Sequence, residues 1–356
     1  MNTFYADESR VRVLGRSLFL NNVRYLSWSC SGIEFFFEGS ELSAEIWTDW
    51  EPKEPWSEMF QGYMAVFVND VEEPFSRFAI NSGTDRYELY KSDKPEKVKI
   101  RIVKLSEAAF DKVGIVSISA DGEIFPTEPK RRTMEFVGDS ITCGFGIEAE
   151  CSEEGFRTAK ENPFIGYAAL TARQFGADYS LISWSSIGVY SSSCGEDDSK
   201  PNDSLLMPML YEYTDMGLEG TLGMGNRILW DFGRSETQVI VVNLGTNDAT
   251  FTKGIPERVG EFERAYGNFL AKIREKNPSA YIICTLGMMG DELFPSIAKV
   301  VEQMRDNRIF AEKFDVQREE DGIGSEGHPN AVTHKKAAER LVKRVSEITG
   351  WECERI

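Results

Sequence analysis

One stretch decides the fold, Met134-Glu135-Phe136-Val137-Gly138-Asp139-Ser140-Ile141-Thr142-Cys143-Gly144. A short apolar run, typical of a buried strand, ends at Gly138, and Ser140 follows on a tight turn. In open α/β folds, ligands bind at the carboxyl ends of the parallel strands. The stretch therefore predicts a serine hydroxyl at the ligand-binding edge of a sheet.

Strands and helices alternate after this stretch. The pattern predicts strands over 134–137, 179–184, 238–244 and 280–286, and helices over 164–175, 259–276, 291–305 and 331–348. Short strands between longer helices are typical of a parallel sheet with helices on both faces. No Gly-x-Ser-x-Gly elbow surrounds Ser140, which argues against the α/β-hydrolase fold. We therefore predict a three-layer α/β/α domain.

Residues 11 to about 125 have the pattern of β structure. Short runs rich in β-branched and aromatic residues are predicted as strands over 32–38, 41–47, 62–68, 97–103 and 113–118. Turn residues separate them, as in Glu38-Gly39-Ser40 and Asn69-Asp70, and no long helical period interrupts them. An all-β sandwich is the natural prediction. The proline-rich and basic stretch Pro126–Arg132 predicts a boundary between domains at 1–128 and 129–356.

Composition excludes several classes of function. The chain has 356 residues and a net charge of −18 (40 − 58), which argues against nucleic acid or an anionic membrane surface as partner. No apolar run reaches about 18 residues, so no membrane span is expected. The six cysteines form no Cys-x-x-Cys pair, which argues against a zinc or redox site, and no cofactor is expected.

The amino terminus bears on localisation. Residues 1–8 have neither the basic start nor the apolar core of a signal peptide. A cytoplasmic protein is the expectation, although a secreted form with its leader removed has the same appearance. The sequence leaves a homo-oligomer possible.

Ser140 is the candidate nucleophile of an acyl-transfer site. Such a site needs a base and hydrogen-bond donors for an oxyanion. The structural alternative is a serine that caps the helix after it. The chain has only two histidines, His328 and His334. His328 lies in a glycine-rich loop and precedes a proline, which favours it as the base, whereas His334 falls inside the last predicted helix.

Two further strand ends supply candidate donors. Asn247 follows the strongly apolar predicted strand 238–244, and its side-chain amide can donate. Gly188 follows the predicted strand 179–184, and its N–H can approach a ligand closely because it has no side chain. The N–H of Ser140 is the third candidate. Each of these residues could instead serve the fold alone, as an asparagine in a turn does.

Taken in order, these residues resemble the four blocks of the SGNH/GDSL hydrolase superfamily. The blocks are Gly138-Asp139-Ser140, Gly188, Gly245-Thr246-Asn247-Asp248 and His328-Pro329. The resemblance implies that Ser140 is the nucleophile and His328 the base. It also implies that the Ser140 N–H, the Gly188 N–H and the Asn247 side chain hold the oxyanion.

A second resemblance covers the rest of the chain. The β-rich segment, with Gly15-Arg16 and Ser31–Phe35, is similar to the jelly-roll domain of carbohydrate esterase family 2, and so are Met207–Tyr211 and Trp230–Phe232. Together the two resemblances imply an all-β jelly-roll sandwich domain ahead of a flavodoxin-like SGNH-hydrolase domain. The second also implies an acetyl xylan esterase-like activity, the removal of O-acetyl groups from xylan or other plant-wall carbohydrates.

The group that orients His328 is open. The superfamily usually has an aspartate three residues before the histidine, where this chain has Ser325. Glu326, Asp321 or a main-chain carbonyl are the alternatives, and Glu326 is the nearest carboxylate.

The leading expectation is therefore a serine esterase acting on an acetylated carbohydrate. Another SGNH activity, such as that of a short-chain lipase, a thioesterase or a peptidoglycan deacetylase, uses the same residues. A carbohydrate-binding protein without catalysis is the third alternative, kept open by the missing aspartate.

Overall fold

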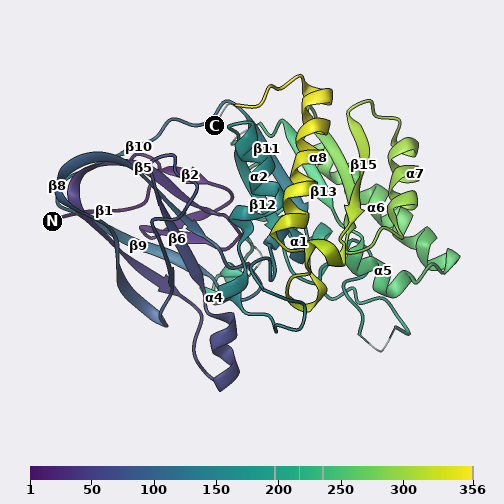
Figure 1. Ribbon diagram of the computed structural model, residues 1–356, viewed down its shortest axis with the longest axis horizontal. Helices are drawn as coiled ribbons and strands as arrows, with labels where there is room; N and C mark the ends of the chain where they lie inside the picture. The colour runs from purple at the N-terminus through teal and green to yellow at the C-terminus, as the bar shows by residue number, and fades with distance from the viewer. Residues whose placement is uncertain (196–197, 216, 235, 355–356) are drawn as a thin grey trace. The chain divides into compact units, whose positions relative to one another are not determined.

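The computed structural model describes residues 1–195, 198–215, 217–234 and 236–354, and Figure 1 labels its elements. The chain divides into two compact units. The first, here the N-terminal unit, comprises Met1–Pro129 together with two later segments, Arg157–Ala159 and Tyr213–Leu229. The remaining segments, Lys130–Phe156, Lys160–Glu212 and Trp230–Ile356, form the C-terminal unit. Within the described residues, no helix combines the length and apolar character needed to cross a membrane.

The N-terminal unit is built almost entirely from strands. Its strands are β1 Asn2–Phe4, β2 Arg12–Leu14, β3 Leu18–Leu20, β4 Val23–Leu26, β5 Gly32–Thr48, β6 Tyr63–Val68, β7 Ser76–Ala79, β8 Gly83–Lys104, β9 Val113–Ala120 and β10 Glu123–Pro126. The 3-10 helix η1 Pro55–Phe60 and the short helix α4 Leu218–Thr221 complete it. The main strand order is β3-β4-β9-β5-β8-β6-β7, and every pairing is antiparallel.

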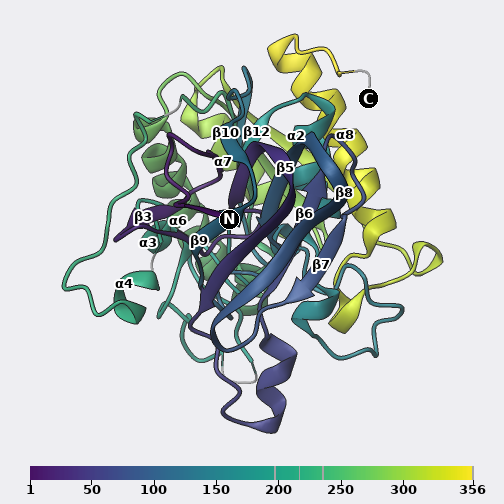
Figure 2. The ribbon, with the colours of Figure 1, turned by 90° about the vertical axis from the view of Figure 1, so that its left-hand side faces the viewer.

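Two long strands, β5 and β8, organise this unit and run side by side in Figure 2. The predicted turn at Glu38-Gly39-Ser40 is wrong, because β5 continues through it. The register of β5 against β8 shifts between Gly39 and Glu41, so an irregularity of the β-bulge kind absorbs the turn-like residues within one strand. Alternate side chains of β5, among them Ile33, Phe35 and Phe37, are fully buried in the core of the unit.

The two late segments are fixed to this unit by specific hydrogen bonds. The indole Nε1 of Trp28 donates to the carbonyl of Thr214 at 2.7 Å, and both residues are buried. The hydroxyl of Thr158 donates to the carbonyl of Gln61 at 2.6 Å. The N-terminal unit is therefore completed by residues that lie far beyond position 129 in the sequence.

The C-terminal unit contains a parallel sheet of five strands in the order β12-β11-β13-β14-β15. The strands are β11 Thr133–Gly138, β12 Asp178–Ser183, β13 Val239–Asn243, β14 Tyr281–Met288 and β15 Ile309–Val316. The helices are α1 Ser140–Cys143, α2 Tyr167–Gln174, α3 Met207–Leu210, α5 Thr246–Thr252, α6 Pro256–Lys276, α7 Phe294–Met304 and α8 Ala331–Thr349. Three 3-10 turns also belong to this unit, η3 Pro163–Ile165, η4 Glu319–Asp321 and η5 Ser325–Gly327, whereas η2 Thr158–Lys160 begins in the N-terminal unit.

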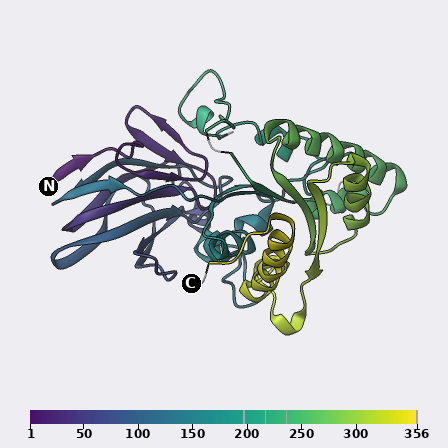
Figure 3. The same ribbon diagram turned by 90° about the horizontal axis from the view of Figure 1, so that it is seen from above.

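Helices cover both faces of this sheet. In Figure 3, α2 lies beside α8, drawn in yellow, on one face, and the green helices α6 and α7 lie on the other. The residues of β13 are buried throughout, as a central strand covered on both faces requires. The prediction of an α/β/α domain that follows a β-rich domain is confirmed.

The strand order places the predicted site residues at one edge. β11 is the first strand of this sheet in chain order, and its neighbours are the sheet's second strand, β12, and its third, β13. The chain therefore reverses its direction of progress across the sheet between β11 and β13, which is the topological switch point where open α/β sheets bind ligands. Ser140 follows β11 and Asn247 follows β13, so both come from the two strands that flank this point.

Candidate active site

Ser140 lies on a tight turn directly after β11. The carboxylate of Asp139 accepts a hydrogen bond from the N–H of Ile141 at 3.0 Å and so caps the single turn of α1. A side chain at Gly138 would meet the hydroxyl of Thr142 at 2.1 Å, so glycine is required there. The N–H of Ser140 belongs to the first turn of α1, where no intrahelical acceptor exists, and it is suited to an external oxyanion.

The structure brings Ser140 and His328 together. The Nε2 atom of His328 lies 2.9 Å from Ser140 Oγ, and its Nδ1 atom lies 3.2 Å from the carbonyl oxygen of Ser325. A carbonyl oxygen only accepts, so Nδ1 must carry the proton of the neutral ring. Nε2 then presents its lone pair to the Ser140 hydroxyl, which is the arrangement that a general base needs.

Glu326, the predicted orienting carboxylate, is occupied elsewhere. Its Oε1 atom accepts a hydrogen bond from the N–H of Phe156 at 3.2 Å. Asp321 instead forms an ion pair with Lys336 at 2.6 Å. The geometry thus favours the main-chain alternative, in which the Ser325 carbonyl orients the imidazole, over either side chain.

Burial sets the charge of the base. Desolvation lowers the pKa of His328 to about 4, although the Ser325 carbonyl and the Glu326 carboxylate favour its charged form. The imidazole is therefore neutral at physiological pH and able to accept a proton. The other histidine, His334, is fully buried in α8, and its Nδ1 accepts a hydrogen bond from the N–H of Tyr167 at 3.1 Å.

The loop that carries Gly188 is anchored by a residue that the sequence did not identify as part of the site. Asp248 is completely buried, and its carboxylate accepts hydrogen bonds from three consecutive N–H groups, those of Val189 at 3.1 Å, Tyr190 at 2.7 Å and Ser191 at 2.9 Å. Burial raises the pKa of Asp248 to about 6, although these N–H groups lower it. The carboxylate is charged at neutral pH and holds the loop beside Asn247, its neighbour in α5.

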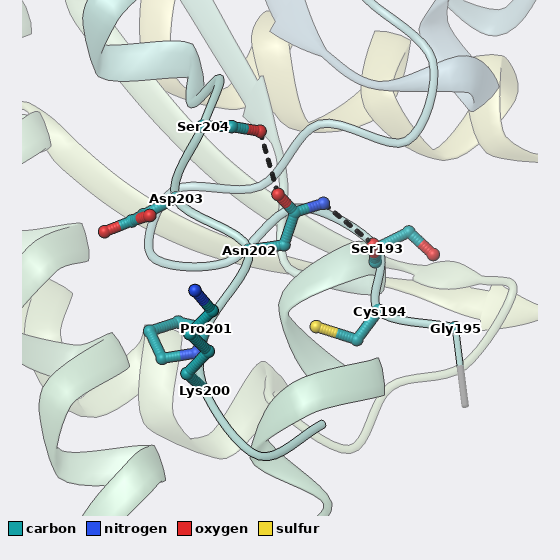
Figure 4. A pocket seen from close by; sticks show the side chains of 8 residues that line it. All are labelled: Ser193, Cys194, Gly195, Lys200, Pro201, Asn202, Asp203 and Ser204. Carbon is teal, nitrogen blue, oxygen red and sulfur yellow. Dashed lines mark hydrogen bonds between the residues drawn. The ribbon is translucent and has the colours of Figure 1, made fainter. Parts of the chain in front are cut away.

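A second set of contacts closes the same loop further along. Ser192 pairs with Asn202 as an isolated β-bridge, and the side chain of Asn202 donates to the carbonyl of Ser193 and accepts from Ser204 (Figure 4). A hollow of about 300 Å³ lies here, and Ser140, Asn247 and His328 do not line it. These contacts stabilise the loop and do not involve the nucleophile.

Asn247 joins the other candidate donors. Its Nδ2 atom donates to the carbonyl of Ile187 at 2.9 Å and, over a longer 3.2 Å, to the carboxylate of Asp139. Because the amide has only two N–H groups, an oxyanion must take the place of one of these two acceptors. These acceptors directly precede Gly188 and Ser140 in the chain. The N–H of Gly188 donates to Ser192 Oγ over 3.3 Å, a long hydrogen bond that a charged oxyanion can replace. The three predicted oxyanion residues therefore lie in one place.

Replacing Asn247 with alanine is expected to lower kcat for an acetyl ester by about 10²- to 10³-fold, the usual cost of one oxyanion donor. KM should change little, because the donor acts on charge that develops in the transition state. Steady-state kinetics on a chromogenic acetate ester measure both constants.

The matched control for that variant is Asn277→Ala. Asn277 is similarly buried, but it caps the end of α6 ahead of β14, at the opposite edge of the sheet. A loss of kcat equal to that of Asn247→Ala would contradict the oxyanion role.

Glu326→Gln should retain kcat within about tenfold, because the glutamine carbonyl still accepts from Phe156 and no charged partner of Nδ1 is removed. If Glu326 were the orienting carboxylate, the same change to an amide would lower kcat by about 10⁴-fold. A loss of that size in the same ester assay would restore Glu326 as the orienting group.

The activity should decrease with acid in two steps. Asp248 takes up a proton near pH 6 and weakens its hold on the Gly188 loop, and His328 takes up a proton near pH 4 and no longer accepts from Ser140. We expect kcat/KM to be nearly constant from about pH 8 to 7 and to fall in turn through these two values. An Asp248→Asn variant should lack the upper step, and a midpoint near 6.5 in that variant would show that His328 titrates as an ordinary histidine.

Comparison with known proteins identifies the families to which the two parts of the chain are similar. Residues 136–336 match the GDSL-like lipase/acylhydrolase family, and residues 13–129 match the carbohydrate esterase 2 N-terminal family. The cellulase/esterase CelE of Acetivibrio thermocellus is 30% identical over 335 residues, which are 91% of this chain and 38% of CelE. The chain thus spans well under half of CelE.

Two further similarities extend over nearly the whole chain. An acetylxylan esterase / glucomannan deacetylase of Cellvibrio japonicus is 25% identical over 361 residues, covering 98% of this chain and 92% of that protein. The structure of a family two carbohydrate esterase from Clostridium thermocellum, in complex with cellohexaose, matches with a TM-score of 0.83 at 28% identity, over 96% of this chain and 99% of that chain. The chain therefore belongs to the GDSL-like lipase/acylhydrolase family, with the two-part organisation of the family 2 carbohydrate esterases.

Proposed function

We propose that this protein is a serine esterase that removes O-acetyl groups from plant-wall carbohydrates, such as xylan and xylo-oligosaccharides. The 2.9 Å contact between Ser140 Oγ and His328 Nε2 carries the proposal, because acyl transfer through serine requires a base on the nucleophile. The relatives named as an acetylxylan esterase and a cellulase/esterase support the substrate class.

In the first half-reaction, Ser140 Oγ attacks the acetyl carbonyl while its proton passes to His328 Nε2. The oxyanion is stabilised by the N–H groups of Ser140 and Gly188 and by the Asn247 side chain. The carbonyl of Ser325 keeps its hydrogen bond from Nδ1–H and stabilises the imidazolium. The imidazolium then protonates the sugar oxygen as its bond to the acetyl carbon breaks.

In the second half-reaction, water replaces the sugar. Neutral His328 takes a proton from the water as its oxygen attacks acetyl-Ser140, and the same donors hold the second oxyanion. Collapse of this intermediate returns the proton to Ser140 Oγ and releases acetic acid. No group other than these residues and water has to move a proton.

The decisive experiment is a product analysis on acetylated xylo-oligosaccharides, compared with acetylated glucomannan oligosaccharides and with butyrate esters. We expect release of acetate from the acetylated sugars and slower hydrolysis of the longer acyl chain. Faster hydrolysis of butyrate would favour a short-chain lipase or a related SGNH activity. No hydrolysis of any ester, with sugar binding retained, would favour a binding protein.

A further inference from the structure

The ring of Phe145 lies against the base. Its centroid is 4.1 Å from that of the His328 imidazole, and the two planes are inclined by 32°. Phe156 stacks on Phe145 with centroids 3.7 Å apart and planes only 13° apart. Two rings this close cannot share one face of Phe145, so Phe145 is held between Phe156 and His328.

The backbone gives Phe145 little freedom to move. It follows Gly144 and precedes Gly146, both of which have the left-handed backbone that favours glycine, with φ of 74° and 59°. A side chain at Gly146 would lie 2.3 Å from Ser325 Cβ, and the Gly146 carbonyl accepts from the Ser325 N–H at 3.2 Å. The turn after the nucleophile is thus packed directly against the loop of the base.

Hydrogen bonds between the segment around Phe156 and the loop of His328 hold Phe156 in place. Its N–H donates to the Glu326 carboxylate, the Glu326 N–H donates to the Ser152 carbonyl at 3.0 Å, and Ser325 Oγ donates to the Glu154 carbonyl at 2.6 Å. Phe145 and Phe156 are 9% and 4% exposed, so the stack excludes water from one face of the imidazole. Glu326 therefore holds Phe156 in place, although its carboxylate does not bind Nδ1 of His328.

We propose that Phe145 is a positioning residue that orients His328 and stabilises its imidazolium through the π face of the phenyl ring. This proposal rests on the esterase mechanism above. When the Ser140 proton reaches Nε2, the imidazole becomes a cation, and the electron-rich face of a phenyl ring attracts a cation within about 6 Å of its centroid. The hydrogen bond from Nδ1 goes to a neutral carbonyl, so the ring supplies part of the electrostatic stabilisation that a carboxylate supplies elsewhere.

The test varies the π face without altering the shape of the side chain. Phe145 is replaced by phenylalanine carrying one, two and three ring fluorines, each of which withdraws electron density from the face. We expect kcat for an acetate ester to decrease with each fluorine, to about tenfold below the parent for the trifluoro ring, with KM unchanged. Phe145→Tyr should retain most of the activity, and Phe145→Leu should lose at least as much as the trifluoro variant.

The same fluorine series at Phe262 is the control. Phe262 is fully buried in α6 beside Tyr266, with ring centroids 5.4 Å apart, and takes no part in the site. Its series should leave kcat constant. A constant kcat across the Phe145 series would overturn the proposal, because burial and shape alone do not depend on fluorination.

An NMR titration separates failure of this proposal from failure of the esterase function. The chain has only two histidines, so the His328 signal can be assigned with His334 as internal reference. If Phe145 stabilises the cation, the pKa of His328 decreases through the fluorine series whether or not any ester is hydrolysed. Loss of esterase activity in the parent would refute the proposed function alone, whereas an invariant pKa would refute the role of Phe145.

Discussion

The Ser140→Ala variant is expected to lose about 10⁴- to 10⁶-fold in kcat for acetyl esters, because the covalent intermediate can no longer form. Its fold should be unaffected, since the capping of α1 depends on Asp139 and not on the Ser140 hydroxyl. Binding of an acetylated oligosaccharide should persist, because the oxyanion donors and the rest of the surface are intact. Burst kinetics measure formation and turnover of the covalent intermediate, and calorimetric titration measures binding of the oligosaccharide, both on one preparation.

Ser183→Ala is the matched control for that variant. Ser183 is buried at the carboxyl end of the neighbouring strand β12, and its hydroxyl accepts a hydrogen bond from the thiol of Cys143. This variant should keep the parent's turnover. Turnover by Ser140→Ala within tenfold of the parent would exclude Ser140 as the nucleophile and, with it, the proposed mechanism.

The His328→Ala variant is expected to lose about 10³- to 10⁴-fold in kcat, since the Ser140 hydroxyl then has no base to take its proton. The effects of the two substitutions should not add. A Ser140→Ala/His328→Ala double variant should be no slower than Ser140→Ala alone, because the two side chains act as a unit. An additive loss would show that His328 acts in a step that does not involve Ser140.

His334 provides the comparison for His328. It is the second histidine of the chain and is buried in α8, where its Nδ1 accepts from Tyr167. His334→Asn should lower the free energy of unfolding, because a buried hydrogen bond and its packing change. We expect kcat per folded molecule to stay near the parent value, and a loss equal to that of His328→Ala would contradict this assignment of the two histidines.

The C-terminal unit could be predicted well from the sequence because its central strands are buried on both faces. Such strands are nearly continuous apolar runs, as in β13, and their ends are easy to recognise. The strand β15 was not predicted, because it is not buried on both faces. It lies at the edge of the sheet, and after Ile309-Phe310-Ala311 it alternates charged with apolar residues, as in Lys313-Phe314-Asp315-Val316, so no long apolar run marks it.

In the candidate site, side chains were easier to recognise from the sequence than the roles of backbone groups, and the carbonyl that orients His328 was only one of three alternatives. Ser140, His328 and Asn247 are recognisable by residue type at the ends of elements. The carbonyl of Ser325 that faces Nδ1 has no counterpart in residue type, because every residue has such a carbonyl. Asp248 could have been suspected from its place beside Asn247, but only the fold shows that three N–H groups converge on it.

The division of the chain between its two units has a consequence for dissecting the protein. Proteolysis in the stretch Lys130–Arg132 would cut the polypeptide without dividing it into two self-sufficient fragments. The carboxyl-terminal fragment would still contain residues 213–229, whose carbonyl at Thr214 is bonded to Trp28 in the other fragment. We expect such a nicked protein to migrate as one particle in gel filtration, and fragment 130–356 expressed alone to be less stable than the intact chain.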